Sequence, residues 1–204
     1  IISIHIPIIL VVTLPLILFW EFTDIFTPIH VIFLELIMGP TCSIIFENEP
    51  TERNAMKRPP EKPGKSFFSL RELSLSIVQG LVITGICLGY GFITMKQGAS
   101  VTETRTIIFI TLIFSNIFLT LENRSFYYSA LTSIGNKNRL IPIILSISFI
   151  VMMLALYFEP VRMVFQLTAL DFKTLMTCIF MAFTGVFWLE LHKLYLRKTT
   201  NTAP

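Results

Sequence analysis

Residues Thr27 to Phe46 read TPIHVIFLELIMGPTCSIIF, and this stretch decides the fold class. It carries one acidic residue, Glu35, and neither Lys nor Arg. Its length matches the about 20 apolar residues that an α-helix needs to cross the hydrocarbon core of a bilayer. The stretch therefore predicts a membrane-spanning helix.

Five further stretches have the same character. The six predicted spans are Ile1–Trp20, Thr27–Phe46, Leu73–Thr94, Thr106–Leu121, Leu140–Phe158 and Leu175–Leu191. Only 14% of the 204 residues are charged and 53% are hydrophobic, whereas about a quarter of a soluble domain is charged. We therefore expect an all-α membrane protein, a polytopic bundle of six transmembrane helices. The fourth span carries Thr111, Ser115, Asn116 and Thr120, so we expect it to face other helices and not lipid.

The basic residues predict an orientation in the membrane. Twelve of the 16 lie in the links after the second and fourth spans and in the tail. Because cytosolic loops carry an excess of Lys and Arg, both ends of the chain are predicted to be cytosolic. We expect an integral protein of the plasma membrane. A net charge of +3 is too small and too scattered to indicate a nucleic-acid partner.

The chain divides into three regions of one membrane domain. Residues 1–46 hold the first two spans, with a broken second helix, and residues 47–72 form a Pro-rich basic cytosolic loop. Residues 73–204 hold four further spans and a short tail. The chain starts with Ile inside or just before a span, so we expect it to be a fragment of a longer protein.

Glu35 is the most informative polar residue, because it lies near the middle of its span. A carboxylate at the bilayer centre costs about 2.5–3.5 kcal/mol on insertion scales, and such residues usually mark ion pathways. Four residues later, Gly39-Pro40-Thr41 predicts a break in the helix, whose freed carbonyls could bind a cation. The alternatives are a hydrogen bond from Glu35 to a neighbouring helix and a simple proline kink.

Two further groups are candidates for the cation site or pathway. On a helix, Thr111, Ser115 and Glu122 share one face, which could line a polar path. Glu122 could equally be a boundary carboxylate paired with Arg124. We treat Glu35 and Glu122 as candidate metal ligands, and His5 in the first span as a pathway candidate or a packed hydrogen-bonding residue.

The residues supply no catalytic centre of their own. The sequence has no phosphate-binding Gly-rich loop, no Ser/His/Asp set and no His/Cys group with metal-ligand spacing. Cys42, Cys87 and Cys178 each lie in an apolar run and are expected to be buried and reduced.

The Pro-rich loop carries a recognisable motif. The run Glu49-Pro50-Thr51-Glu52-Arg53-Asn54-Ala55-Met56-Lys57-Arg58-Pro59-Pro60 resembles the loop between the sixth and seventh membrane helices of P-type cation ATPases. Leu119-Thr120-Leu121-Glu122-Asn123-Arg124-Ser125 resembles the end of the eighth helix in the calcium ATPases of that family. The resemblance covers essentially the whole chain and implies helices five to ten of the parent protein.

The resemblance also implies a partly altered cation site. The Asn, Thr and Asp ligands of the family's sixth helix fall on Glu35, Met38 and Gly39. The eighth-helix Glu falls on Glu122, and the fifth-helix Asn falls near His5. A site with fewer carboxylates suits one cation or a proton better than two calcium ions.

The implied activity is ATP-driven cation transport with ATP and magnesium bound upstream of this fragment, which itself holds no ATP or phosphorylation site. Its expected partners are the lipid bilayer, upstream cytosolic ATPase domains and the first four membrane helices of the same chain. The loop residues Pro50, Met56, Arg58, Pro59 and Pro60 would couple hydrolysis to transport, or be a plain connector. The alternatives are an ATP-independent six-helix secondary transporter or channel subunit, and a scaffold bundle with Glu35 joining helices.

Overall fold

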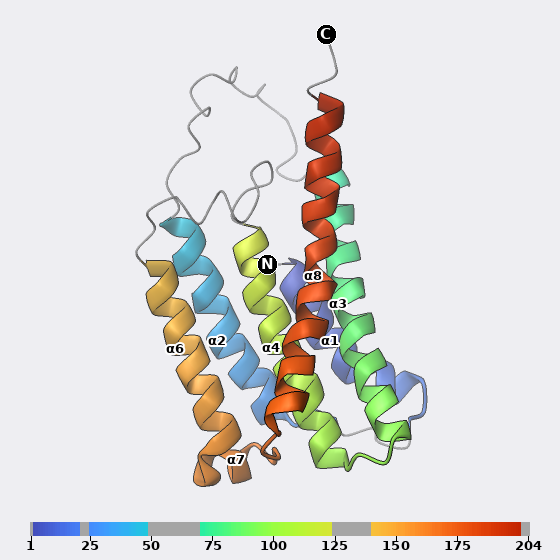
Figure 1. Cartoon of the computed structure of the whole chain (residues 1–204), viewed down its shortest axis with the longest axis vertical. Coiled ribbons are helices and arrows are strands. Elements are labelled where there is room, and N and C mark those ends of the chain that lie inside the picture. The colour runs from blue at the N-terminus through green and yellow to red at the C-terminus, as the bar shows by residue number, and fades with distance from the viewer. Residues whose placement is uncertain (1, 21–24, 49–69, 124–139, 201–204) are drawn as a thin grey trace.

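The computed structural model describes residues 2–20, 25–48, 70–123 and 140–200, with the backbone alone at 40–42, 71–72 and 195–200. These residues form helices and turns without any strand. Figure 1 shows the long helices standing side by side with alternating directions. The helices are α1 (Ile2–Ile17), α2 (Pro28–Glu47), α3 (Leu70–Lys96), α4 (Val101–Glu122), α6 (Leu140–Tyr157), α7 (Glu159–Val164) and α8 (Phe172–Thr200).

The predicted all-α membrane bundle is confirmed. Five of the described helices, α2, α3, α4, α6 and α8, are long and apolar enough to cross a bilayer. Helix α1 is shorter, with 16 residues. It ends before the predicted Trp20 because Phe19 adopts a left-handed backbone with φ of 50°, which a helix does not accommodate.

Several helices extend beyond the predicted apolar runs. Helix α4 begins at Val101 and not at Thr106, because Ser100 caps it: its hydroxyl oxygen accepts a hydrogen bond from the Glu103 amide at 3.2 Å. Helices α3 and α8 likewise continue into polar residues at Lys96 and Thr200. Polar residues end an apolar run without ending a helix, so the runs underestimate helix length.

Helix α2 differs from the expected broken helix. The structure gives Pro28–Glu47 as one helix of 20 residues that runs through Gly39. A proline inside a helix removes one backbone hydrogen bond and can leave the helical turns on either side in place. The break predicted at Gly39-Pro40 is therefore not an interruption of the helix.

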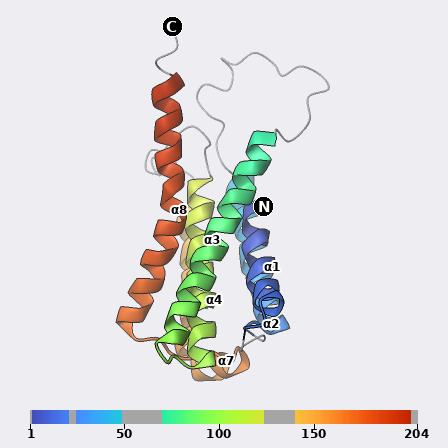
Figure 2. The same cartoon turned by 90° about the vertical axis from the view of Figure 1, so that its right-hand side faces the viewer.

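Helix α4 is the central element of the bundle. In its membrane window 89% of the residues are buried, against 27–44% in the other four spans. Figures 1 and 2 show it surrounded by the other long helices. This confirms that the span with the polar residues faces other helices and not lipid.

One end of the bundle is fastened by Arg105, near the start of α4. Its Nε donates to the Ile25 carbonyl at 2.7 Å, ahead of α2. Its guanidinium also donates to the carbonyl and side-chain oxygens of Gln166, at 3.3 and 3.0 Å, in the link between α7 and α8. We call these three residues the Arg105 anchor, and it joins three segments that are distant in the sequence.

Helix α7 is a short helix that the sequence analysis did not predict. It lies beside the end of α6, at the same end of the bundle as the Arg105 anchor (Figure 1). Pro160 lies in its first turn, where a missing amide hydrogen costs nothing.

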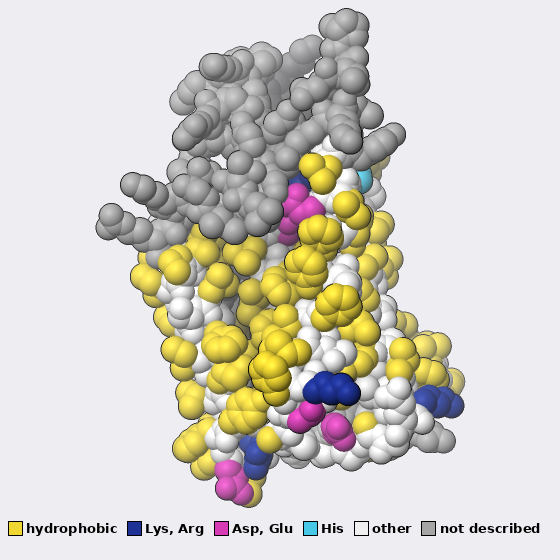
Figure 3. All heavy atoms as spheres, in the orientation of Figure 1, with side chains coloured by type: hydrophobic (Ala, Val, Ile, Leu, Met, Phe, Trp, Pro, Cys, Tyr) yellow, Lys and Arg dark blue, Asp and Glu magenta, His cyan; other side chains and the backbone are white. Residues whose placement is uncertain are grey.

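The surface view shows a broad apolar band above charged side chains at the end of the bundle that carries α7, as a lipid-facing surface requires (Figure 3).

Helices α2 and α4 end, and α3 and α6 begin, at the opposite end of the bundle (Figure 1). We call this the loop end. Twelve basic residues fall in the links after the second and fourth predicted spans and in the tail after the predicted Leu191. The cytosolic assignment of this end stays a prediction. The coupling residues Pro50, Met56, Arg58, Pro59 and Pro60 lie outside the described residues.

Candidate functional site

Glu35 on α2 is paired with His5 on α1. The His5 Nε2 and Glu35 Oε2 atoms are 3.2 Å apart, which is an ion pair when the imidazole is protonated. The side chains are 42% and 41% exposed, so the pair lies at an outer edge of the described bundle. The structure thus joins two residues that the sequence analysis had singled out separately.

The surroundings of the pair are open on the α2 side. Ile32 and Leu36, on either side of Glu35 along α2, are 65% and 69% exposed. Gly39 lies one turn after Glu35, on the same helical face, and a Cβ atom there would meet nothing within 4 Å. An ionisable pair that faces hydrocarbon is costly, so this face requires a polar or protein covering in a membrane.

A second group of polar side chains lies inside the bundle on α4. Thr111, Ser115 and Asn116 are fully buried. Both the nitrogen and the oxygen of the Asn116 amide have no hydrogen-bond partner among the described residues, whereas the Thr111 and Ser115 hydroxyls interact with the thiols of Cys178 and Cys87. Leaving a buried polar group unsatisfied costs about 1–3 kcal/mol, so the Asn116 amide favours a polar partner such as water.

Asn116 was noted in the sequence only as part of the polarity of its span, and it was not named as a site residue. The available signal was a carboxamide, with two donors and one acceptor, in the middle of an apolar run. Its two unpartnered amide atoms now make it a stronger candidate than Ser115, which offers one hydroxyl.

Glu122 is engaged by a cation of the protein itself. The Lys193 ammonium on α8 lies 2.8 Å from the Glu122 carboxylate and donates to the Glu122 carbonyl oxygen at 2.6 Å. The two side chains are 6% and 9% exposed. Glu190, also buried, lies three residues before Lys193 on α8. The expected alternative partner, Arg124, lies outside the described residues.

The candidate metal ligands Glu35 and Glu122 are therefore in separate pairs. Within the described ranges, no group of three or more His, Cys, Asp and Glu side chains could hold a metal ion. Of the four predicted pathway residues in α2, Glu35 and Gly39 are fully described, whereas Pro40 and Thr41 are described by backbone alone. Cys87 and Cys178 are free thiols and buried, as predicted.

Comparison with known proteins identifies the sequence family of the chain. Residues 23–195 match the sequence family described as the carboxy-terminal region of cation-transporting ATPases. The chain belongs to this family. The resemblance that the loop motif indicated is thereby confirmed, and the bundle is a carboxy-terminal membrane region of a P-type ATPase.

A specific relative of this cation-ATPase region is calcium-transporting ATPase 2 of Schizosaccharomyces pombe (strain 972). The two sequences are 25% identical over 105 residues, which is 50% of this chain and 8% of the yeast protein. The matched segment thus spans a small part of that relative. The family match begins at residue 23, so it includes Glu35 and Glu122 and leaves His5 outside.

Proposed function

We propose that this cation-ATPase region is the membrane transport part of an ATP-driven pump, in which Glu35 and His5 supply part of the cation site. The observation that supports this most directly is the pair itself. A carboxylate and an imidazole from two different helices meet within 3.2 Å inside predicted membrane spans. Intramembrane ionisable residues are retained mainly where they bind or relay ions.

The exposure of the pair supports a partner on its open side. About two fifths of each side chain is uncovered, and Gly39 leaves space beside them. The first four membrane helices of the same chain would cover this face and complete the ligand set. The upstream cytosolic domains would bind ATP and magnesium and carry the phosphorylated residue.

The residues of the proposed site favour a transported cation with a single positive charge. One carboxylate beside an imidazole neutralises a single positive charge, whereas calcium is bound by six to eight oxygens that include several carboxylates. We therefore propose a monovalent cation or a proton as cargo, with His5 releasing Glu35 when the cation binds. Asn116 and Ser115 on α4 would provide neutral oxygens along the route.

Glu122 has a different place in this proposal. A cation could reach its carboxylate only by displacing the Lys193 ammonium, which is already 2.8 Å away. Glu122 therefore serves the pathway through its pairing with α8, and motion of α8 would uncover it. The link 47–72 would carry the motion of the phosphorylated domain to α2 and α3.

The test replaces Glu35 by Gln in the complete protein reconstituted in vesicles. ATP hydrolysis and cation uptake are measured across sodium, potassium, calcium and manganese, and across pH. We expect Glu35→Gln to abolish uptake and the cation stimulation of hydrolysis. The matched control is Glu159→Gln, an exposed carboxylate at the start of α7.

Two outcomes would contradict the proposal. Uptake by Glu35→Gln at the level of the control would exclude Glu35 from the site. Uptake by the unmodified protein that continues without ATP, and that is lost in Glu35→Gln, would favour the ATP-independent transporter.

A further inference from the structure

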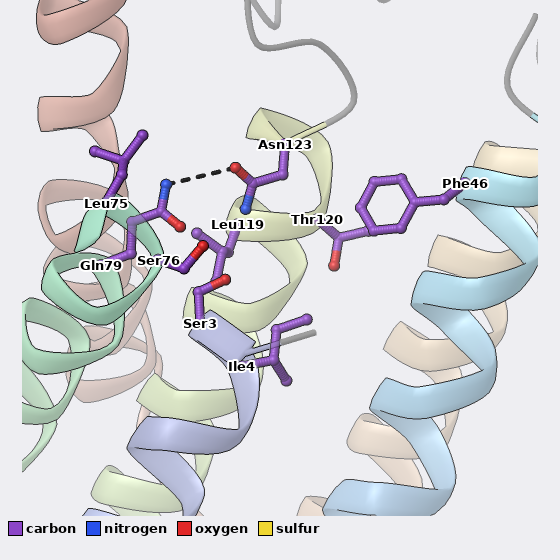
Figure 4. A pocket seen from close by; sticks show the side chains of 9 residues that line it. All are labelled: Ser3, Ile4, Phe46, Leu75, Ser76, Gln79, Leu119, Thr120 and Asn123. Carbon is purple, nitrogen blue, oxygen red and sulfur yellow. Dashed lines mark hydrogen bonds between the residues drawn. The ribbon is translucent and has the colours of Figure 1, made fainter. Parts of the chain in front are cut away.

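A cavity of about 240 Å³ lies between α1, α2, α3 and α4 at the loop end of the bundle. A water molecule occupies about 30 Å³ of liquid, so the cavity has room for several. Figure 4 shows the side chains that line it, converging from the four helices. Five of them are polar: Ser3, Ser76, Gln79, Thr120 and Asn123.

The polar lining consists of hydroxyls and amides only. None of the nine lining residues is ionisable. Gln79 on α3 and Asn123 at the end of α4 face each other, with Nε2 donating to Oδ1 at 3.5 Å (Figure 4). That distance is beyond the usual 2.7–3.2 Å range, so the contact is weak and opens at little cost.

The cavity continues the polar face of α4 towards the membrane interior. Thr120 and Asn123 follow Asn116 by four and seven residues, which places all three on one face of the helix. A rise of about 1.5 Å per residue puts Asn116 about 6 Å deeper than Thr120. The Thr120 hydroxyl donates to the Asn116 carbonyl at 2.8 Å, while the Asn116 amide itself has no partner.

We propose that this cavity is the inlet of the cation route on the loop side of the membrane, leading along α4 to Asn116. This inference rests on the proposed transport function. The cavity is large enough for a partly hydrated ion, and its hydroxyl and amide oxygens can replace part of the water around that ion. The unpartnered Asn116 carboxamide lies one helical turn further into the membrane.

The side chains that line the cavity determine which ions the proposed inlet can conduct. A passage conducts only if its groups bind an ion weakly enough to release it. Neutral oxygens without a carboxylate offset the partial loss of water from a monovalent cation, but not that from a divalent cation, which requires charged ligands. The inlet therefore suits a partly hydrated monovalent cation or a chain of waters that carries a proton.

The test measures access of water-borne reagents to single cysteines in the complete protein. Cys42, Cys87 and Cys178 are first replaced by Ala. Ser76→Cys then places a thiol on the cavity wall with almost no change in volume. Ile77→Cys is the matched control, because it lies at the same depth on α3 with its side chain 39% exposed on the outer surface.

A charged, membrane-impermeant methanethiosulfonate is applied to each side of sealed vesicles. Because the thiolate is the reacting species and forms only in contact with water, we expect Ser76→Cys to react at least ~tenfold faster than Ile77→Cys, from the loop side. We also expect the modified protein to lose ATP-driven uptake. A Thr120→Cys variant, at a lining position that is only 1% exposed, should react more slowly from the same side, and its modification should also block uptake.

Equal rates for Ser76→Cys and Ile77→Cys would overturn the inlet, as would reaction from the opposite side alone. Modification that leaves uptake unchanged would show a water-filled cavity off the route, and would overturn it too. These outcomes are separate from a failure of the proposed function, which would appear as normal uptake by Glu35→Gln in the unmodified protein.

Discussion

Replacing Lys193 by Met should destabilise the bundle strongly. The ammonium is 2.8 Å from the Glu122 carboxylate, and both side chains are more than nine-tenths buried. At an effective dielectric constant of about 20, that separation corresponds to about 6 kcal/mol of attraction before desolvation is counted. Desolvation offsets much of this, yet removing one partner leaves a buried charge alone, which costs about 3–5 kcal/mol.

The double variant distinguishes the interaction between Lys193 and Glu122 from the separate effects of the two substitutions. Lys193→Met with Glu122→Gln removes both charges, so the isolated carboxylate no longer exists and most of the loss should be recovered. We expect a coupling free energy of about 2–3 kcal/mol from the double-mutant cycle. The matched control is Lys173→Met, an exposed lysine in the first turn of the same helix, with an effect within about 0.5 kcal/mol.

The assay is denaturant unfolding of the complete protein in mixed micelles, with ATP-driven uptake measured on the same variants. If Lys193→Met is as stable as Lys173→Met, the pair does not hold α4 against α8 and our reasoning is wrong. Uptake by the stable double variant then decides the role of Glu122. Normal uptake indicates a structural pair, whereas its loss indicates that the carboxylate also serves the cation route.

Two further predictions concern packing at glycines and the Arg105 anchor. Gly80→Ala should destabilise the bundle more than Gly91→Ala in the same unfolding assay. The new Cβ at Gly80 would lie 2.6 Å from the Cβ of Ile6, which cannot move without α1, whereas that at Gly91 meets the flexible end of Ile108; equal losses would contradict this. Arg105→Lys should cost about 2 kcal/mol or more, because an ammonium on a flexible stem cannot reproduce the directed guanidinium bonds, and a loss no larger than that of Lys173→Met would show that charge alone suffices.

The spans were predictable because each depends only on its own composition. A run of apolar residues such as Leu140–Tyr157 must leave water wherever the rest of the chain lies. The central place of α4 was also predictable, since Thr111 and Asn116 need polar neighbours that lipid does not provide. Helix α7 was not predictable in the same way, because six residues are too few to show a period.

The sequence was sufficient to single out individual residues of the candidate site, but not to predict which of them are in contact. Glu35 was identifiable as a candidate site residue because a charged residue is unusual in an apolar run. That it meets His5 depends on how α1 is rotated and shifted against α2, which no local pattern fixes. The pairing of Glu122 with Lys193, 71 residues later, depends in the same way on the packing of α4 against α8.

The polar interior of α4 has a consequence for how the protein is made. During synthesis α4 leaves the ribosome well before α8, so Glu122 has no Lys193 and Arg105 has no Gln166 when the helix first reaches the bilayer. A segment with these groups is costly to release into lipid alone. The insertion machinery must therefore hold α4, or α3 must shield it, until the last helix emerges, and a nascent chain cut before α8 should remain bound to that machinery.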